Sequence, residues 1–380
     1  MFTQMTMTSS VLATSPAASL RLSTRLRRSA GRALRASWLH PLNDTVALNE
    51  LLADVNPLWS LTEIRAELIE RTAETADTVS LRFHANRLWT GFRAGQHVGL
   101  SVEIKGVRQH RVYSLTSDPA DRRTLRITVK RQPGGRVSNY LHDELRIGDV
   151  VTLSPADGAF TLPDAAEPLL LLSAGSGITP MRALLHELHT RDPQRDVVLL
   201  HICRNPDDRI FAGELAALQR QLPQLRVLPV YTTRGRPVLA ELLAQVPDYA
   251  TRQTLLCGPA AFMAEVEAHW QAQTIASRLQ LERFGAPLAR RDADTTQATV
   301  QCVRSTRQFD ASSHEPLLVS AERAGLAPAY GCRIGICRTC LCHKRSGVVE
   351  NLVSGERSDT GSEWIRLCVS APRSDLELDL

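Results

Sequence analysis

The chain has 380 residues, of which 43% are hydrophobic and 22% are charged, and its net charge at pH 7 is only +5. This length permits two or three domains with their own cores, and no apolar run approaches the roughly 18 residues that a membrane-spanning helix requires. Eight cysteines without a secretory signal peptide argue against a disulfide framework, so we expect a cytoplasmic protein with reduced thiols and no nucleic-acid partner.

The basic charge is concentrated in an N-terminal extension, residues 1–57. Six arginines lie between Arg21 and Arg35, whereas the first acidic residue is Asp44. The stretch LRLSTRLRRSAGRALRASWL has the pattern of a basic amphipathic helix, which would make peripheral contact with the anionic inner face of a membrane. A disordered start, a start codon placed too early, or an organellar transit peptide would look the same, and the sequence leaves these alternatives open.

Residues 58–165 are predicted to form an antiparallel β-barrel. Short β-type runs recur there, separated by Gly, Pro and Asp turns, and this spacing is typical of barrels. The runs are TVSLRFHA, HVGLSVEI, RVYSLT, LRITVK and DVVTLS.

Residues 166–285 alternate buried apolar strands with helices, which predicts a doubly wound α/β domain with a parallel sheet. Residues 286–297 are polar, lack apolar periodicity and are predicted to be a linker. Residues 298–380 form a third unit, in which two β-type runs bracket a group of cysteines. The strands of the second domain are PLLLLS, DVVLLHI, RVLPVYT, QTLLCG and RLQLERF, and the helices are PMRALLHELHT, FAGELAALQRQL, VLAELLAQV and AAFMAEVEAHWQA.

The cysteine spacing is the strongest chemical signal in the sequence. Cys332, Cys337 and Cys340 have the spacing C-x4-C-x2-C, and Cys368 follows at a distance. This pattern matches the four thiolate ligands of a plant-type [2Fe–2S] cluster. The glycines in the loop suit a backbone that closely approaches a compact cluster. A structural zinc site is the alternative, although such sites usually show paired C-x2-C knuckles.

The segment LLVSAERAGLAPAYGCRIGICRTC, with the later IRLCVSAPRSDLELDL, resembles the ferredoxin domain at the C-terminus of bacterial oxygenase and desaturase reductases. The resemblance covers residues 298–380 and implies an α+β, β-grasp-like fold around the cluster. Cys342 lies outside the ligand spacing and is interpreted as a buried thiol. Arg338 departs from the family, which usually has Gly there. With Arg333, Lys344 and Arg345 it predicts a basic rim around the cluster and an acidic docking face on the partner.

Two segments of the predicted barrel are similar to flavin-binding motifs of the ferredoxin–NADP reductase superfamily. RVYSL matches the family's R-x-Y-S, with FRAGQHV before it, and GGRVSNYL stands at the family's Gly-Ser phosphate loop. The resemblance implies FAD, with Arg111 on the pyrophosphate, Tyr113 on the flavin ring and Ser114 near flavin N5. A guanidinium fork matches phosphate oxygens, and an aromatic ring covers a flat cofactor. At the start of a helix, Gly134, Gly135, Val137 and Ser138 would present N–H groups to an anion.

The segment AGSGITPMRALL is similar to the G-x-G-x-x-P turn that binds the nicotinamide dinucleotide in this superfamily. Its glycines allow close approach of a pyrophosphate, and the following helix supplies N–H donors. LLCGP resembles the motif that places the nicotinamide beside the flavin. The implied binding residues are Gly175, Gly177, Thr179, Pro180, Cys257, Gly258 and Pro259, and the expected catalytic residues are Tyr113, Ser114 and Cys257.

Three arginines bear on the choice of dinucleotide. Arg204 and Arg209 follow the strand VVLLHIC, and Arg234 lies in TTRGR, where a 2′-phosphate would bind. An NAD-type protein would prefer an acidic residue at a strand end to bind the ribose. We therefore expect NADPH, with NADH as the alternative. Phe284, in LERF, resembles the family's terminal aromatic residue near the flavin.

The three modules together imply a reductase that takes a hydride from NAD(P)H and delivers single electrons to a partner. The stretch from His40 to Phe83 resembles the reductase partners of acyl-CoA and fatty-acid desaturases, which implies a membrane diiron desaturase or hydroxylase as acceptor. One alternative is the reductase of a soluble ring-hydroxylating or multicomponent oxygenase. The other, from a different class, is a non-catalytic electron carrier or a redox-sensing interaction protein.

Overall fold

The computed structural model describes residues 45–380 except 165, 236, 285–295, 332, 334, 336–338 and 354. The predicted basic helix therefore lies outside the described residues. The chain divides into two compact units, Met1–Thr62 and Glu63–Leu380. In the first unit, helix α2 (Thr45–Val55) carries Asn49, whose amide oxygen accepts from the Leu61 N–H at 2.7 Å and whose amide nitrogen donates to Thr62 Oγ1. No helix among the described residues has both the length and the apolarity needed to cross a membrane.

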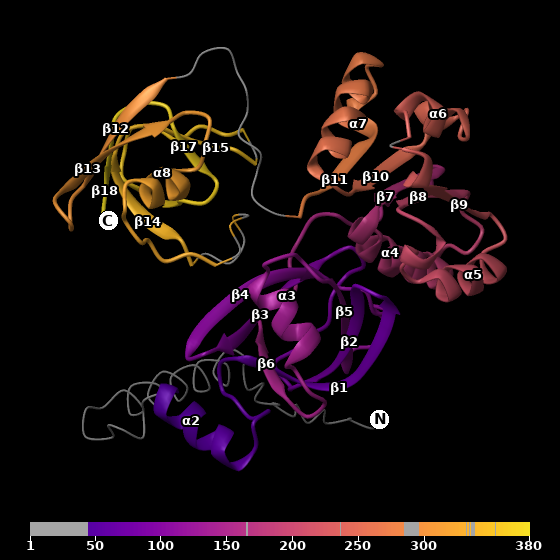
Figure 1. Ribbon diagram of the computed structural model, residues 1–380, viewed down its shortest axis with the longest axis horizontal. Coiled ribbons are helices and arrows are strands. Elements are labelled where there is room, and N and C mark those ends of the chain that lie inside the picture. The colour runs from indigo at the N-terminus through magenta and orange to yellow at the C-terminus, as the bar shows by residue number, and fades with distance from the viewer. Residues whose placement is uncertain are drawn as a thin grey trace, which may run out of the picture. The chain divides into compact units, whose positions relative to one another are not determined.

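The first sheet of the second unit is an antiparallel barrel (Figure 1). Its six strands run in the order β4-β3-β6-β1-β2-β5, and a bridge between Leu115 and Ile127 joins the two ends of this order. A two-residue turn, Lys105–Gly106, connects β3 to β4 with positive φ at both positions, as a tight hairpin requires. The elements are β1 (Ile64–Thr75), β2 (Thr78–Ala85), β3 (His97–Ile104), β4 (Val107–Ser114), β5 (Thr124–Lys130), α3 (Arg136–Asp143) and β6 (Val150–Leu153).

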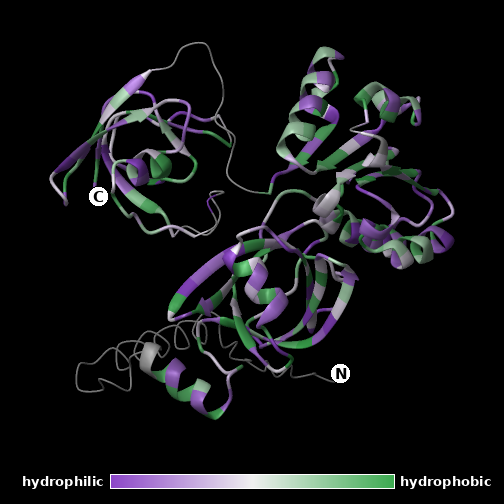
Figure 2. Cartoon of the chain, viewed as in Figure 1, coloured by the Kyte–Doolittle hydropathy of each residue, from purple (hydrophilic) through white to green (hydrophobic). Residues whose placement is uncertain are grey.

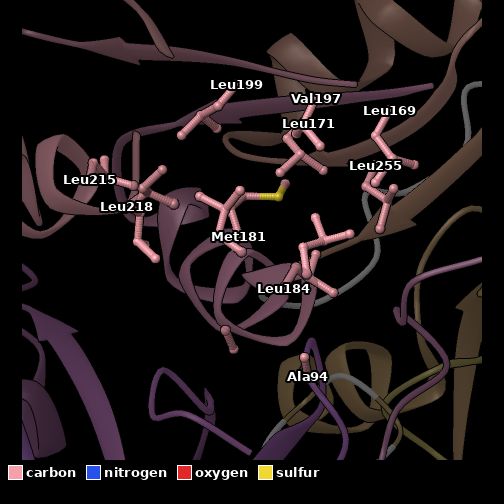
Figure 3. Packing of buried hydrophobic residues seen from close by; sticks show 14 of the residues in the cluster. Ala94, Leu169, Leu171, Met181, Leu184, Val197, Leu199, Leu215, Leu218 and Leu255 are labelled. Atoms are coloured by element: carbon pink, nitrogen blue, oxygen red, sulfur yellow. The ribbon is translucent and has the colours of Figure 1, made fainter. Parts of the chain in front are cut away.

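A five-stranded parallel sheet follows, in the order β11-β10-β7-β8-β9. Two of its inner strands, β7 (Leu169–Ala174) and β8 (Val197–Cys203), are buried at every residue, as expected where helices cover both faces. Leu169, Leu171 and Leu199 pack with α4 and α5 on one face, shown in Figure 3, whereas Leu170 and Leu172 pack with α6 and α7 on the other. The elements are β7 (Leu169–Ala174), α4 (Ile178–Arg191), β8 (Val197–Cys203), α5 (Ala212–Gln221), β9 (Leu225–Tyr231), α6 (Leu239–Ala244), β10 (Gln253–Cys257), α7 (Ala260–Ala272) and β11 (Leu279–Glu282).

Hydropathy along the helices of this domain explains that layering. In Figure 2, hydrophilic and hydrophobic colours alternate along α4, α5 and α7. In α4, Met181, Leu184, Leu185 and Leu188 recur at helical spacing and are buried, which places one stripe against the sheet. The predicted doubly wound architecture is confirmed.

One buried histidine in this domain makes the stability of the protein sensitive to pH. His201 on β8 is buried, its Nδ1 lies 2.8 Å from Ser173 Oγ, and burial lowers its pKa to about 4. The unfolded chain therefore binds more protons below pH 6.5 than the folded chain, so stability is complete above that pH and is lost as the pH falls towards 4. We expect His201 to contribute a loss of about 2 kcal/mol between pH 7.5 and pH 5. Urea unfolding at both pH values should show a smaller pH effect in His201→Leu, and an equal effect would contradict this assignment.

The C-terminal domain is a mixed sheet with one covering helix. The sheet order is β13-β12-β18-β14-β16, β12 and β18 are parallel, and a separate pair joins β15 to β17. Leu317, Leu318 and Ala321 of α8 pack into its core. This arrangement is the predicted α+β, β-grasp-like fold. The elements are β12 (Gln297–Cys302), β13 (Arg307–Ser312), α8 (Leu317–Arg323), β14 (Leu341–Ser346), β15 (Val349–Asn351), β16 (Glu363–Arg366), β17 (Ser370–Pro372) and β18 (Leu376–Leu378).

Candidate functional site

A cavity of about 400 Å³ gathers residues from both sequence motifs of the barrel. It also receives residues from the turn before α4 and from the end of the parallel-sheet domain. Predicted residues on its walls are Arg111, Tyr113, Ser114, Gly135, Val137, Ser138, Thr179 and Phe284. The other lining residues were not named from the sequence: Val112, Arg136 and Ser176 lie inside the quoted motifs, and Thr128, Lys130 and Gln132 lie outside them.

The end of β4 gives this cavity an unsatisfied polar group. The Ser114 hydroxyl is buried and has no hydrogen-bond partner, although such groups in proteins nearly always have one. Next to it, Tyr113 is largely buried, and burial raises the pKa of its hydroxyl. A flat ring system with polar edge atoms would cover the tyrosine and supply the partner that the serine lacks. These residues therefore fit a flavin.

The start of α3 provides the features of an anion site. Gly134 has φ of +69°, and a Cβ added to Gly135 would lie 2.5 Å from Ser138 Oγ, so the loop is tight. The first turn of a helix leaves N–H groups without intrahelical partners, and these groups attract anions. Lys130 and Arg136 lie on the same walls. Together with Arg111 they give the cavity three cationic side chains, of which Lys130 is paired with Asp77 at 3.2 Å, and this set suits a diphosphate.

The predicted dinucleotide turn lies between β7 and α4. Gly175 has φ of +55°, a conformation that favours glycine. A Cβ at Gly177 would lie 2.1 Å from the Cys257 carbonyl oxygen, so only glycine lets this turn pack against β10. The Thr179 hydroxyl donates to Ser176 O at 2.8 Å, and Pro180 is buried in the first turn of α4. The two glycines, the Thr179 hydrogen bond and the buried proline therefore fix the conformation of this turn.

The C-G-P segment lies at the end of β10, and its residues do not line the described cavity. The Cys257 side chain is completely buried, and burial together with the nearby Glu282 raises the pKa of its thiol. A Cβ at Gly258 would lie 3.2 Å from Ala174 Cβ, which reflects close packing against β7. Pro259 is exposed just before α7. A bound dinucleotide could contact the Cys257 thiol only if neighbouring side chains moved.

Two of the three arginines expected at a 2′-phosphate, Arg204 and Arg209, already have partners. Arg204 forms ion pairs with Asp77, at 2.7 Å, and with Asp208. Arg209 donates to the Ala212 carbonyl at 3.4 Å, and neither arginine lines the described cavity. The side chain of Arg234 lies outside the described residues.

Two of the four predicted cluster ligands, Cys332 and Cys337, lie outside the described residues. The other two, Cys340 and Cys368, are 3% and 2% exposed, and the Leu367 N–H donates to the Cys340 carbonyl at 3.1 Å. Their chain segments are therefore adjacent. Gly335, with φ of +82°, comes so close to Val369 that a Cβ would lie 2.9 Å from its Cγ1. This close approach of the cysteine loop to the second segment fits a compact cluster.

Cys342 follows Cys340 by two residues, but it lies on β14 and its side chain packs into the core of the C-terminal domain. Its thiol is buried, donates to the His343 carbonyl at 3.7 Å, and has a pKa that burial raises to about 11. The Cys342 side chain therefore packs into the core of the domain, which suits a structural role and not that of a cluster ligand.

The predicted basic rim is wrong for Lys344, which is completely buried. Its ammonium donates to Gly347 O at 2.6 Å and Asp359 O at 2.7 Å, because alternation along β14 turns it inward with Cys342. Arg333 is paired with Glu322, and Arg345 is paired with Asp379. Arg338 lies outside the described residues. The described residues of this group therefore carry little uncompensated positive charge.

Three family descriptions match the chain in order. Residues 65–162 match the oxidoreductase FAD-binding domain, residues 171–268 the oxidoreductase NAD-binding domain, and residues 300–373 the 2Fe-2S iron-sulfur cluster binding domain. An NADPH oxidoreductase of Mycobacterium tuberculosis is 36% identical over 86% of each chain. The NADH oxidoreductase HCR of Escherichia coli is 33% identical over 83% of this chain and 97% of its own.

Among solved structures, phthalate dioxygenase reductase is similar with a TM-score of 0.56 and 26% identity, over 84% of this chain and 98% of its own. Its structure is described as modular, for electron transfer from pyridine nucleotides to [2Fe–2S].

Proposed function

The chain belongs to the ferredoxin–NADP reductase superfamily, among the members that end in a 2Fe–2S domain, and from this premise we propose that it carries electrons from NADPH through FAD and its cluster to a partner oxygenase. It is an NAD(P)H oxidoreductase. FAD held in this cavity would supply two-electron acceptance of a hydride and release of single electrons, which a cluster that takes one electron at a time requires. The observation that supports the proposal most strongly is the cavity where Arg111, Ser114, Ser138 and Thr179 meet.

Each wall of the cavity has a proposed role. Arg111, Lys130 and Arg136 bind the diphosphate together with the N–H groups at the start of α3. Tyr113 covers the flavin ring, and the Ser114 hydroxyl bonds its polar edge. Gly175, Gly177, Thr179 and Pro180 form the dinucleotide turn, and Cys257 remains the predicted residue beside the nicotinamide.

We propose NADPH as the preferred donor. The similarity to an enzyme named for NADPH supports this choice, whereas the similarity to one named for NADH and the two carboxylates on Arg204 weaken it. A 2′-phosphate must displace Asp77 or Asp208 to reach that guanidinium, so we expect only modest discrimination between the two dinucleotides.

We propose a membrane diiron desaturase or hydroxylase as the electron acceptor. This choice rests on the resemblance of the N-terminal stretch described above and on the basic N-terminal extension. The similarity to phthalate dioxygenase reductase favours a ring-hydroxylating oxygenase as the second candidate. Reconstitution with each class of oxygenase, with the full chain and with residues 1–44 removed, separates them, because only a membrane acceptor should lose activity on truncation.

Anaerobic titration of the purified protein with NADPH, and separately with NADH, tests the reductase proposal. We expect NADPH additions to bleach both the flavin band and the cluster absorbance, in a protein that contains one FAD and two cluster irons per chain. A preparation that binds zinc and no flavin, or that is not reduced by either dinucleotide, would contradict the proposal.

A further inference from the structure

Three charged side chains connect the barrel to the helix that follows the dinucleotide turn. Glu214, in the first turn of α5, accepts two hydrogen bonds from Arg126 of barrel strand β5, both at 2.8 Å. The same carboxylate accepts a hydrogen bond from Arg182 of α4. We refer to Arg126, Arg182 and Glu214 as the arginine–glutamate joint.

The joint also reaches the end of the flavin motif. Arg182 donates to the carbonyl of Thr116, which lies two residues after Ser114, and the Thr116 N–H donates to the Arg126 carbonyl at 2.7 Å. In α4, Arg182 lies one turn after Thr179, which lines the cavity. Arg182 therefore contacts the segment just beyond β4, the strand that bears one wall of the cavity, and it belongs to the helix that bears another.

An aromatic ring supports both guanidinium groups. The carbon atoms of the Arg126 and Arg182 guanidinium groups lie 5.3 Å and 5.5 Å from the Phe211 ring centroid, a distance suited to cation–π attraction. Phe211 has φ of +60°, which is strained for a bulky residue. Such strain persists only where surrounding contacts fix it, and here the conformation places the ring under the arginines.

The charges of the joint are partly shielded from solvent, because both guanidinium groups are largely buried while the Glu214 side chain is 38% exposed. Arg182 is 8% exposed, and burial lowers its pKa. Burial opposes ionisation of Glu214, but hydrogen bonds from Arg126 and Arg182 outweigh it and lower its pKa to about 2. Partly buried, multiply bonded ion pairs are screened less by solvent than exposed ones, and their geometry is more sharply defined.

We propose that the arginine–glutamate joint fixes α4 and its dinucleotide turn against the end of the flavin motif, so that Arg182 and Glu214 are positioning residues for hydride transfer. The inference rests on the proposed function, because it assigns the joint a task in that reaction. Small displacements of reacting groups reduce transfer rates strongly, whereas dinucleotide binding depends mainly on the turn itself. Loss of the joint should therefore slow transfer more than it weakens binding.

Stopped-flow bleaching of the flavin band with NADPH tests this proposal in the full-length, FAD-loaded protein. In Glu214→Gln the limiting rate constant should fall about tenfold to a hundredfold, while the Kd for NADP⁺ changes within about threefold. Hydrogen exchange gives a readout without turnover: amides of 114–118 and 178–186 should exchange faster than in the wild type. The matched control is Asp164→Asn, which removes the exposed pair to Arg191 of the same helix and should change neither quantity.

Arg182→Met is the second variant, because it leaves the pair of Arg126 with Glu214 intact and the remaining charge balanced. It should reproduce the slower transfer even if Glu214→Gln does not fold. A limiting rate constant within twofold of the wild-type value in FAD-loaded Arg182→Met would contradict the proposed positioning role of the joint. If neither dinucleotide reduces the wild-type protein, the proposed function is wrong. Hydrogen exchange then tests the joint by itself: unchanged amide exchange rates at residues 114–118 and 178–186 in Arg182→Met would show that the joint does not fix these segments.

Discussion

Cys340→Ala is expected to abolish the [2Fe–2S] cluster, whereas Cys342→Ala, only two residues away, is expected to keep it. Cys340 has the ligand spacing and lies beside the segment of Cys368, while Cys342 points into the core of β14 with a pKa raised by burial to about 11. Bound iron should therefore fall to background in the first variant and stay at two atoms per chain in the second.

Artificial electron acceptors distinguish electron transfer from the flavin and electron transfer from the cluster in the same two variants. Ferricyanide, which takes electrons from flavin directly, should be reduced by NADPH in both proteins. Cytochrome c reduction should disappear only in Cys340→Ala, since it depends on the cluster. Iron retained in Cys340→Ala, or lost from a folded Cys342→Ala, would show that the ligand assignment is wrong.

Gly177→Ala is expected to disable the dinucleotide turn. Its added methyl group would lie 2.1 Å from the Cys257 carbonyl oxygen and 2.9 Å from the Gly258 nitrogen, and neither backbone atom can yield as a flexible side chain would. The start of α4 must then move away from β10, at a cost on the order of 1–3 kcal/mol in the free energy of unfolding. We expect the Kd for NADP⁺, measured by difference absorbance, to rise by at least about tenfold.

The matched control is Gly213→Ala in α5, where an added Cβ meets nothing within 4 Å. This change should stabilise the protein by about 0.5–1 kcal/mol, because alanine loses less conformational entropy in a helix than glycine. Its dinucleotide affinity should equal that of the wild type. Equal affinity in Gly177→Ala and Gly213→Ala would contradict the assignment of the turn.

Much of the fold could be predicted, because hydrophobic periodicity and turn residues indicate the same boundaries for most helices and strands. The runs TVSLRFHA and HVGLSVEI coincide with β2 and β3, and AAFMAEVEAHWQA coincides with α7. Strand β1 was not predicted. Its sequence IRAELIERTAET is rich in residues that favour helices, and it forms a strand because Ile64, Ala66 and Leu68 alternate into the barrel core.

The site was predictable where a motif carries it and not where tertiary packing builds it. Arg111, Tyr113 and Ser114 were identified from a single strand. Thr128 and Lys130 line the same cavity, but their part in it depends on β5 meeting β4, which no local pattern reveals. The arginine–glutamate joint has the same origin, since its members are separated by more than thirty residues.

The burial of Lys344 has a practical consequence for labelling this protein. The sequence has only three lysines, Lys105, Lys130 and Lys344. Lys130 is paired with Asp77, and Lys344 has no contact with solvent, whereas Lys105 is exposed at the tip of the β3–β4 hairpin. Apart from the amino terminus, an amine-reactive dye should therefore attach chiefly at one point on the barrel. Fluorescence energy transfer between that dye and the flavin can then follow motions of the molecule, and the cysteines that bind iron remain unmodified.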